Sequence, residues 1–247
     1  MRTKYIVSIG SVFAVLIGVP LVIWLYEPAS CFDGELNQGE YSIDRGGPCT
    51  LLDSRALIPH AVLWTQEFKV RDGLYNAVAY IENPNQEAGV IEAPYRLKLY
   101  DDRNVLVAER TGVTFVMPGN ITPIFVGSIP SGERTAARAF LEFAAPLVWE
   151  RLYDRTKEVK VTNKRLRQET TTPRITAEIE NDGVKDLTDV EVVAVVFDTA
   201  GNAFAASSTN IPLLPGGEKR EVVFTWPAPF EYKQSRIDVI VTALPSE

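Results

Sequence analysis

Hydrophobic and polar residues follow two different patterns along this chain. Between Tyr5 and Tyr26 there is no charged residue, and Ile, Val, Leu and Phe dominate the run. At about 1.5 Å per residue, this run is long enough to cross a hydrocarbon core of ~30 Å as one helix. After residue 60, apolar positions come in short groups such as "YRLKLYD" at 95–101 and "VEVVAVVFD" at 190–198. These groups are typical of strands. We therefore expect a transmembrane helix over residues 5–26, followed by β-structure.

The charges that flank this run predict its orientation. Arg2 and Lys4 precede it and Glu27 follows it, so the positive-inside rule keeps residues 1–4 in the cytoplasm. The chain would then be a single-pass protein of the cell membrane, with its bulk extracytoplasmic. A cleaved signal peptide and a lipidated Cys31 are the alternatives. The length of the run and the position of Pro28 favour an uncleaved anchor.

The part after residue 60 repeats itself. Three short motifs of the first half recur in the second half at a spacing that is constant to within one residue. The pairs are Ile81-Glu82-Asn83 with Ile179-Glu180-Asn181, Tyr100-Asp101 with Phe197-Asp198, and Pro118-Gly119 with Pro215-Gly216. We interpret this as a domain duplication, with one domain at 60–162 and the other at 163–247, behind a loop and stalk at 27–59. Interfaces between domains of one chain are often small and polar, so we expect this junction to flex.

Each repeat predicts a hairpin at the same place. A strand ends in Asp101 or Asp198, a short polar connection follows, and a second apolar group begins. Asn104 and Gly201 occupy equivalent positions in that connection, and both residue types tolerate the positive φ that tight hairpins require. Regular turn signals and the lack of a helical period after residue 60 predict antiparallel β-sandwiches, one per repeat.

The hairpin motif resembles the FxLYD family of bacterial extracytoplasmic domains. The residues that fall on the family motif are Leu97, Leu99, Tyr100 and Asp101 in the first copy, and Ala194, Val196, Phe197 and Asp198 in the second. The resemblance implies two tandem immunoglobulin-like antiparallel β-sandwiches, an all-β fold behind one N-terminal transmembrane helix. Domains of this family serve as spacers, binding modules or parts of envelope assemblies, and the resemblance brings no catalytic residues.

Composition narrows the range of functions. The net charge is −7, with 25 basic and 32 acidic residues, which disfavours nucleic acid as a partner. His60 is the only histidine, so the chain offers little for acid–base catalysis or a zinc site, and we expect no enzyme activity. Trp64, Trp149 and Trp226 are expected to pack the cores or the junction. The alternative is an aromatic platform for a sugar or a peptide.

The two cysteines, Cys31 and Cys49, enclose a short acidic loop, "CFDGELNQGEYSIDRGGPC". In an oxidising compartment they are expected to form a disulfide. Oxygen-bearing side chains recur inside the loop at Asp33, Asn37, Glu40 and Asp44, and calcium prefers such oxygen ligands. The loop also resembles a calcium-type motif of secreted bacterial proteins, C-x-D-G-x-x-N-x-x-E-x-x-x-D-C-G-G-x-C, in which Arg45 replaces the middle cysteine. Two interpretations stay open: a calcium site, or a polar turn closed by a disulfide.

Together these observations predict a non-catalytic module of the cell envelope that binds or scaffolds another envelope protein. The alternative is a ligand-binding or sensory module that recognises carbohydrate, peptide or calcium. Apart from calcium, no cofactor is indicated, and the membrane is contacted through residues 5–26.

Overall fold

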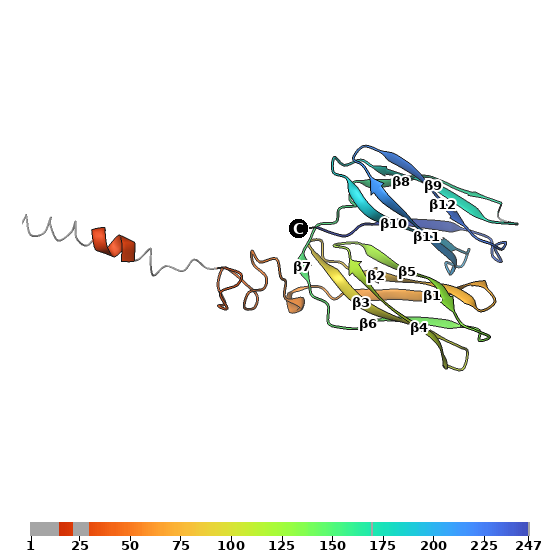
Figure 1. Ribbon diagram of the computed structural model, residues 1–247, viewed down its shortest axis with the longest axis horizontal. Helices are drawn as coiled ribbons and strands as arrows, with labels where there is room; N and C mark the ends of the chain where they lie inside the picture. Colours follow the sequence, from red (N-terminus) through yellow and green to blue (C-terminus); the bar gives the residue numbers. More distant parts are fainter. Residues whose placement is uncertain (1–14, 22–29, 169, 247) are drawn as a thin grey trace, which may run out of the picture. The chain divides into compact units, whose positions relative to one another are not determined.

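The computed structural model describes residues 15–21, 30–168 and 170–246. The chain forms two compact units, Met1–Cys49 and Thr50–Glu247, each with its own internal contacts. Figure 1 shows the strands of the second unit, which carries almost all of the regular structure.

In the first unit, residues 15–21 are helical and residues 30–49 form a series of turns. The transmembrane helix expected at 5–26 lies mostly outside the described residues, which include only 15–21 of it, and the expected tip at 1–4 lies wholly outside them. Within the ranges that the structure describes, no helix is both long enough and apolar enough to span a membrane.

The described part of the second unit is almost entirely β, as expected. A short 3-10 helix, η1 (Ser54–Ala56), precedes the strands. The strands are β1 (Ala61–Arg71), β2 (Leu74–Glu82), β3 (Ala88–Tyr100), β4 (Leu106–Val116), β5 (Ile121–Pro130), β6 (Arg138–Phe143), β7 (Glu150–Arg151), β8 (Val159–Arg167), β9 (Arg174–Asn181), β10 (Leu187–Phe197), β11 (Ala203–Leu214), β12 (Lys219–Thr225) and β13 (Arg236–Thr242).

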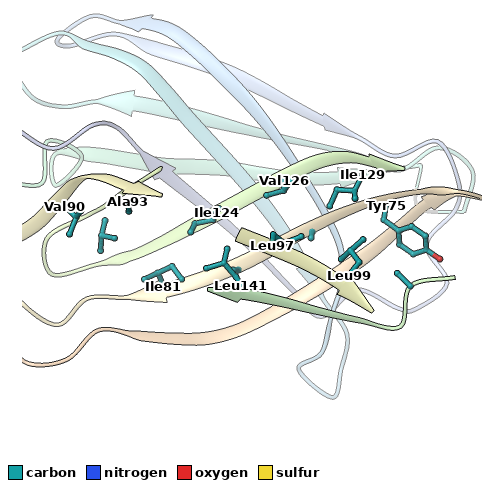
Figure 2. Packing of buried hydrophobic residues seen from close by; sticks show 14 of the residues in the cluster. Tyr75, Ile81, Val90, Ala93, Leu97, Leu99, Ile124, Val126, Ile129 and Leu141 are labelled. Atoms are coloured by element: carbon teal, nitrogen blue, oxygen red, sulfur yellow. The ribbon is translucent and has the colours of Figure 1, made fainter. Parts of the chain in front are cut away.

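These strands form four antiparallel sheets. Their orders are β1-β2-β5, β4-β3-β6 with β7 paired to β3, β12-β9-β8, and β11-β10-β13. The first two sheets enclose one hydrophobic core, in which Ile81, Leu97, Leu99 and Ile129 are fully buried (Figure 2). The last two sheets enclose a second core of the same kind, built around residues such as Phe224. The sandwich-like layering follows from strands that direct alternate side chains to opposite faces.

A third apolar cluster joins the two sandwich-like halves. It contains Val78 of β2 and Val193 and Val195 of β10, all at 0% exposure, together with Phe68 and Tyr80. The junction is therefore apolar, not polar as the expectation of flexing assumed; the flexing itself stays a prediction. The physical reason is visible in the sequence: "VVAVVF" at 192–197 is apolar at consecutive positions, and both faces of β10 are buried there.

Two asparagines of the repeated motifs make the same hydrogen bonds in the two halves. The Asn83 side chain donates to the carbonyls of Ala88 at 2.6 Å and Met117 at 2.9 Å. Asn181 donates to the carbonyls of Lys185 at 2.8 Å and Leu214 at 3.1 Å. Both asparagines are almost fully buried, so each side chain satisfies backbone groups that would otherwise lack partners.

The two predicted hairpins also agree in detail. Asp101 Oδ1 accepts from two backbone N–H groups of its own turn, at 2.9 and 2.8 Å, and Asp198 Oδ1 does the same at 2.8 Å in both cases. Asn104 has φ 62° and Gly201 has φ 87°. The prediction of positive φ at these two positions is confirmed.

One strand differs from its expected place. The segment "EVKVT" at 158–162 was expected to belong to the first domain, at 60–162, but it lies at the start of β8, which pairs with β9 of the second half. The expected boundary between residues 162 and 163 therefore falls inside β8. Alternation identifies a strand but not its partner, since pairing depends on contacts that are distant in sequence.

Candidate functional site

The loop between the two cysteines is closed as predicted. Cys31 and Cys49 form a disulfide, with their Cα atoms 5.5 Å apart. Between them the backbone turns sharply at Gly34, Gly39 and Asp44, all of which have positive φ. These turns allow acidic and amide side chains that are distant along the loop to contact one another.

Asp33 and Asn37 are in direct contact. Asn37 Nδ2 donates to Asp33 Oδ2 at 3.0 Å, and the backbone N–H groups of Ser30 and Glu35 donate to the same carboxylate at 2.8 and 2.9 Å. The Asn37 amide, followed by these backbone groups, lowers the pKa of the Asp33 carboxyl. Asp33 therefore stays ionised within this turn at neutral pH.

The carboxylates of Glu40 and Asp44 accept further hydrogen bonds within the loop. Glu40 Oε2 accepts from the backbone N–H of Asp44 at 3.1 Å and from that of Asn37 at 3.5 Å. Asp44 Oδ1 accepts from the backbone N–H of Gly34 at 3.3 Å. All four predicted ligands thus belong to one hydrogen-bonded loop.

Some features of the loop fit a calcium site, and others fit a polar turn closed by a disulfide. Among the described residues, one group places three candidate ligand atoms within 4.8 Å, and it consists of Glu40 with Cys31 and Cys49. Both sulfurs are used in the disulfide, so neither is a thiolate that could bind a metal. The carboxylates mainly accept from backbone N–H groups, as in a polar turn. Asn37 Oδ1, however, is buried without a partner among the described residues, which leaves one oxygen available to a cation. Calcium binding stays a prediction.

A second candidate site lies where the two sandwich-like halves meet. It is a hollow of about 210 Å³. Phe68 and Val70 line it from β1 of the first half, and Phe204 of β11 lines it from the second half. The connection after β12, "WPAPFEY" at 226–232, supplies another part of the wall.

Aromatic rings hold this wall together. Phe230 packs edge-on against Phe204 at 5.2 Å and against Trp226 at 5.2 Å, while Tyr232 lies 5.7 Å from Phe204. Such edge-to-face pairs stabilise an aromatic cluster beyond the area they bury. The result is a preformed apolar notch on the surface of the protein.

The tryptophans otherwise lie where the sequence indicated. Trp149 is buried in the first core, and Trp64 packs against the junction cluster. His60 lies between Phe143 and Trp149, with ring centroids 5.5 and 5.6 Å away. Burial lowers the pKa of His60. Its aromatic surroundings fit a packing role.

A basic strip covers the outer face of β8 and β9. Arg167 lies directly opposite Arg174 in the register of the two strands, with Arg165 nearby. These three side chains line a shallow hollow of about 640 Å³ together with Glu178 and Glu221.

The sequence did not predict the hollow between the two halves. Trp226 was expected, together with Trp64 and Trp149, to pack the cores or the junction, with an aromatic platform for a sugar or a peptide as the alternative. The available signal was "WPAPF", where two prolines, which restrict the backbone, separate two aromatic residues. The sequence did not show that Phe68 and Val70, which are far from this segment along the chain, would form another part of the wall.

Comparisons with known proteins place the chain in no family. No protein-family model matches it, and no curated protein matches it. Among solved structures, it is similar to a red sea bream transglutaminase (10% identity, TM-score 0.26), covering 76% of this chain and 32% of that one. It is also similar to a Bacteroides uniformis beta-glucuronidase (13% identity, TM-score 0.21), covering 71% of this chain and 22% of that one. A third similar structure is the CBM22-1-CBM22-2 tandem domain from Paenibacillus barcinonensis Xyn10C (8% identity, TM-score 0.16), covering 76% of this chain and 91% of that one. The chain spans about a third or less of the first two proteins, and likenesses this weak carry no argument.

Proposed function

We propose that this protein is a membrane-anchored, extracytoplasmic module of the cell envelope that binds or scaffolds another envelope protein and performs no catalysis. Its two halves are tandem immunoglobulin-like sandwiches of the FxLYD type. The apolar run at 5–26 anchors it, with the N-terminus in the cytoplasm. The matched hydrogen bonds of Asn83 and Asn181 support the duplication.

The observation that carries this proposal is the apolar junction. A binding scaffold must hold its contact surfaces in a fixed relation, and Val78, Val193 and Val195 are completely buried between the two halves. Their burial packs the two halves against each other, with a preformed hollow where they meet. Preformed surfaces lose less entropy on binding than mobile ones.

Crosslinking in the source cells tests the proposal. The full chain carries a photoreactive residue at the exposed position Tyr232, or at the exposed position Phe140 on β6 as a second site. We expect one defined envelope protein to be crosslinked in the membrane fraction. Recovery of the chain alone, from both sites and in all growth conditions, would overturn the proposal.

A fusion experiment tests the topology separately. A reporter that is active only outside the cytoplasm is joined after Glu247 of the full chain. The charges at Arg2 and Lys4 predict activity. Activity of a cytoplasm-dependent reporter at the same place would contradict the proposed orientation.

A second candidate function is calcium-dependent ordering of the loop, which the orphaned Asn37 Oδ1 favours. Calcium would be held by Asp33, Asn37, Glu40 and Asp44, with an affinity in the ~0.1–1 mM range of extracellular modules. Calcium is titrated into the oxidised chain while amide spectra of residues 31–49 are recorded. Signals that do not move, or that move equally in an Asp33→Ala, Asp44→Ala double variant, would leave the loop as a closed polar turn.

A further inference from the structure

The hollow between the two halves has an apolar floor and a charged rim. The floor continues into the junction, since Phe68 and Ala206 belong to the junction cluster and also line the hollow. Its far wall is the aromatic cluster of Phe204, Trp226 and Phe230. The hollow is therefore an extension of a packed interface that is left open to solvent.

Two charged side chains, Lys69 and Glu231, line the hollow. Lys69 lies at the hollow, but its ammonium group forms an ion pair with Asp72 at 2.8 Å. Glu231 also lines the hollow and is exposed. Within the described ranges, no ion pair of Glu231 is found within 4.0 Å. Because Asp72 offsets the charge of Lys69, Glu231 is the lining carboxylate with which a basic residue of a ligand can pair.

The wall also contains an unsatisfied donor. Trp226 Nε1 is buried and has no acceptor among the described residues. An unpaired buried donor typically costs ~1–3 kcal/mol. It lies next to the exposed connection at 227–229, so a small shift of that connection would open it to an acceptor such as a peptide carbonyl.

The size and the ring geometry of the hollow indicate the kind of ligand. About 210 Å³ is below the ~300–1,000 Å³ of sites that enclose whole small molecules, and it suits one or two side chains. A sugar ring stacks on a flat aromatic face. Here Phe204 and Phe230 meet at 85° and Trp226 and Phe230 at 70°, so the rings form a notch instead of a platform.

We propose that this hollow is the docking groove for an extended, proline-containing basic segment of the partner protein. A proline or leucine side chain sits in the notch formed by Phe204, Phe230 and Tyr232, and an arginine or lysine of the segment pairs with Glu231. Proline-containing segments are already extended before binding, and aromatic-lined grooves recognise them in this way. The proposal rests on the proposed function, because it specifies how the partner is bound.

The test uses the full chain labelled with ¹⁵N at tryptophan, which gives four indole signals because the sequence has four tryptophans. The probe is the capped peptide RPPLPPLPR. The control peptides are EPPLPPLPE, with acidic ends, and RGSLGSLGR, without proline. Maltohexaose serves as the sugar probe. The Trp226 signal is assigned from its loss in a Trp226→Phe variant.

We expect RPPLPPLPR to shift the Trp226 signal saturably, and both control peptides to bind more weakly. Phe204→Ala removes part of the notch and should weaken binding about tenfold or more. Glu231→Gln should weaken it about threefold and reduce its salt dependence. Phe140→Ala, at an exposed phenylalanine of β6, is the matched control and should change nothing. Retained dispersion of the other indole signals shows that each variant is folded.

Three results would overturn the inference. The Trp226 signal could stay fixed up to millimolar RPPLPPLPR, Phe140→Ala could weaken binding as much as Phe204→Ala, or maltohexaose could shift the signal where the peptide does not. The proposed function is tested independently by the crosslinking experiment. If the partner still crosslinks to the Phe204→Ala chain as it does to the native one, the docking groove is refuted while the protein-binding function stands.

Discussion

The buried Asn181 side chain allows a stability prediction that can be worked from the structure. Asn181 is 2% exposed at the end of β9. It donates to the carbonyls of Lys185 and Leu214 and accepts from the N–H of Gly183 at 3.1 Å. Replacing Asn181 with Ala leaves these three backbone groups without their partner, and the bonds to Leu214 and Gly183 are buried away from water.

The expected loss follows from these three bonds. Hydrogen bonds contribute ~0.5–1.5 kcal/mol each, and a buried group left unpaired costs ~1–3 kcal/mol. Because some relaxation is possible, we expect Asn181→Ala to lower the free energy of unfolding by about 3–4 kcal/mol. That is a large part of the ~5–15 kcal/mol of a typical domain. At about 2–4 °C per kcal/mol for a protein of this size, the melting temperature should fall by roughly 6–16 °C.

Urea unfolding monitored by tryptophan fluorescence measures the effect. Asn83→Ala, the equivalent change in the first half, should cost a similar amount because Asn83 makes corresponding bonds. Asn210→Ala, at an exposed position of β11, is the control and should stay within about 0.5 kcal/mol of the native chain. If the apolar junction couples the two halves, both buried variants shift one common transition. If Asn181→Ala lowers the free energy of unfolding by less than about 1 kcal/mol, while the dependence of that free energy on urea concentration is unchanged, the reasoning is refuted.

Three further predictions concern the junction, a hairpin and the basic strip. Val195→Asp places a carboxylate in the junction cluster, where Val195 is 0% exposed. It should cost at least ~3 kcal/mol and separate the unfolding transitions of the two halves; a single unshifted transition in urea would contradict this. Backbone N–H groups, led by that of Asn202, lower the pKa of Asp198 below 3.8. Asp198 therefore stabilises the fold above its unfolded pKa, and this contribution disappears as the pH falls through its folded value. The difference in urea midpoint between the native chain and Asp198→Asn should shrink below about pH 4, and a difference that is constant with pH would be evidence against it. Finally, Arg167→Glu should stabilise the protein by about 0.2–1 kcal/mol, since it replaces a like-charge pair opposite Arg174 with an attractive one; lowered stability in the same assay would argue against this.

The fold class and local geometry were largely accessible from the sequence. Strand-like groups such as "YRLKLYD" are strands, and the permissive residues Asn104 and Gly201 have the positive φ expected of them. The pairing of Cys31 with Cys49 is also as predicted. These features depend on neighbouring residues or, for the disulfide, on there being only two cysteines. Local steric rules are therefore sufficient to predict them.

Which strands and side chains contact one another in the folded chain was harder to predict. The strand at 158–162 was recognised but assigned to the wrong half, because nothing in its own pattern identifies β9 as its neighbour. In the loop, the spacing of Asp33 and Asn37 suggested proximity, and the two side chains do touch. The spacing could not show that most of the carboxylate oxygens of Asp33, Glu40 and Asp44 already accept from backbone N–H groups.

By itself, the sequence determined which segments are extended, where they turn and which two cysteines pair, since these depend on side-chain branching, permitted φ values and chain proximity. Only the tertiary structure decided that β2 and β10 are buried on both faces and that Phe68 meets the "WPAPF" connection. Consecutive apolar residues can be covered by a core, a second domain or a membrane. The hydrophobic effect is non-directional, so the apolar pattern alone does not show which of these three covers them. The junction and its hollow result from which surfaces meet, and that depends on the shape of the whole folded chain.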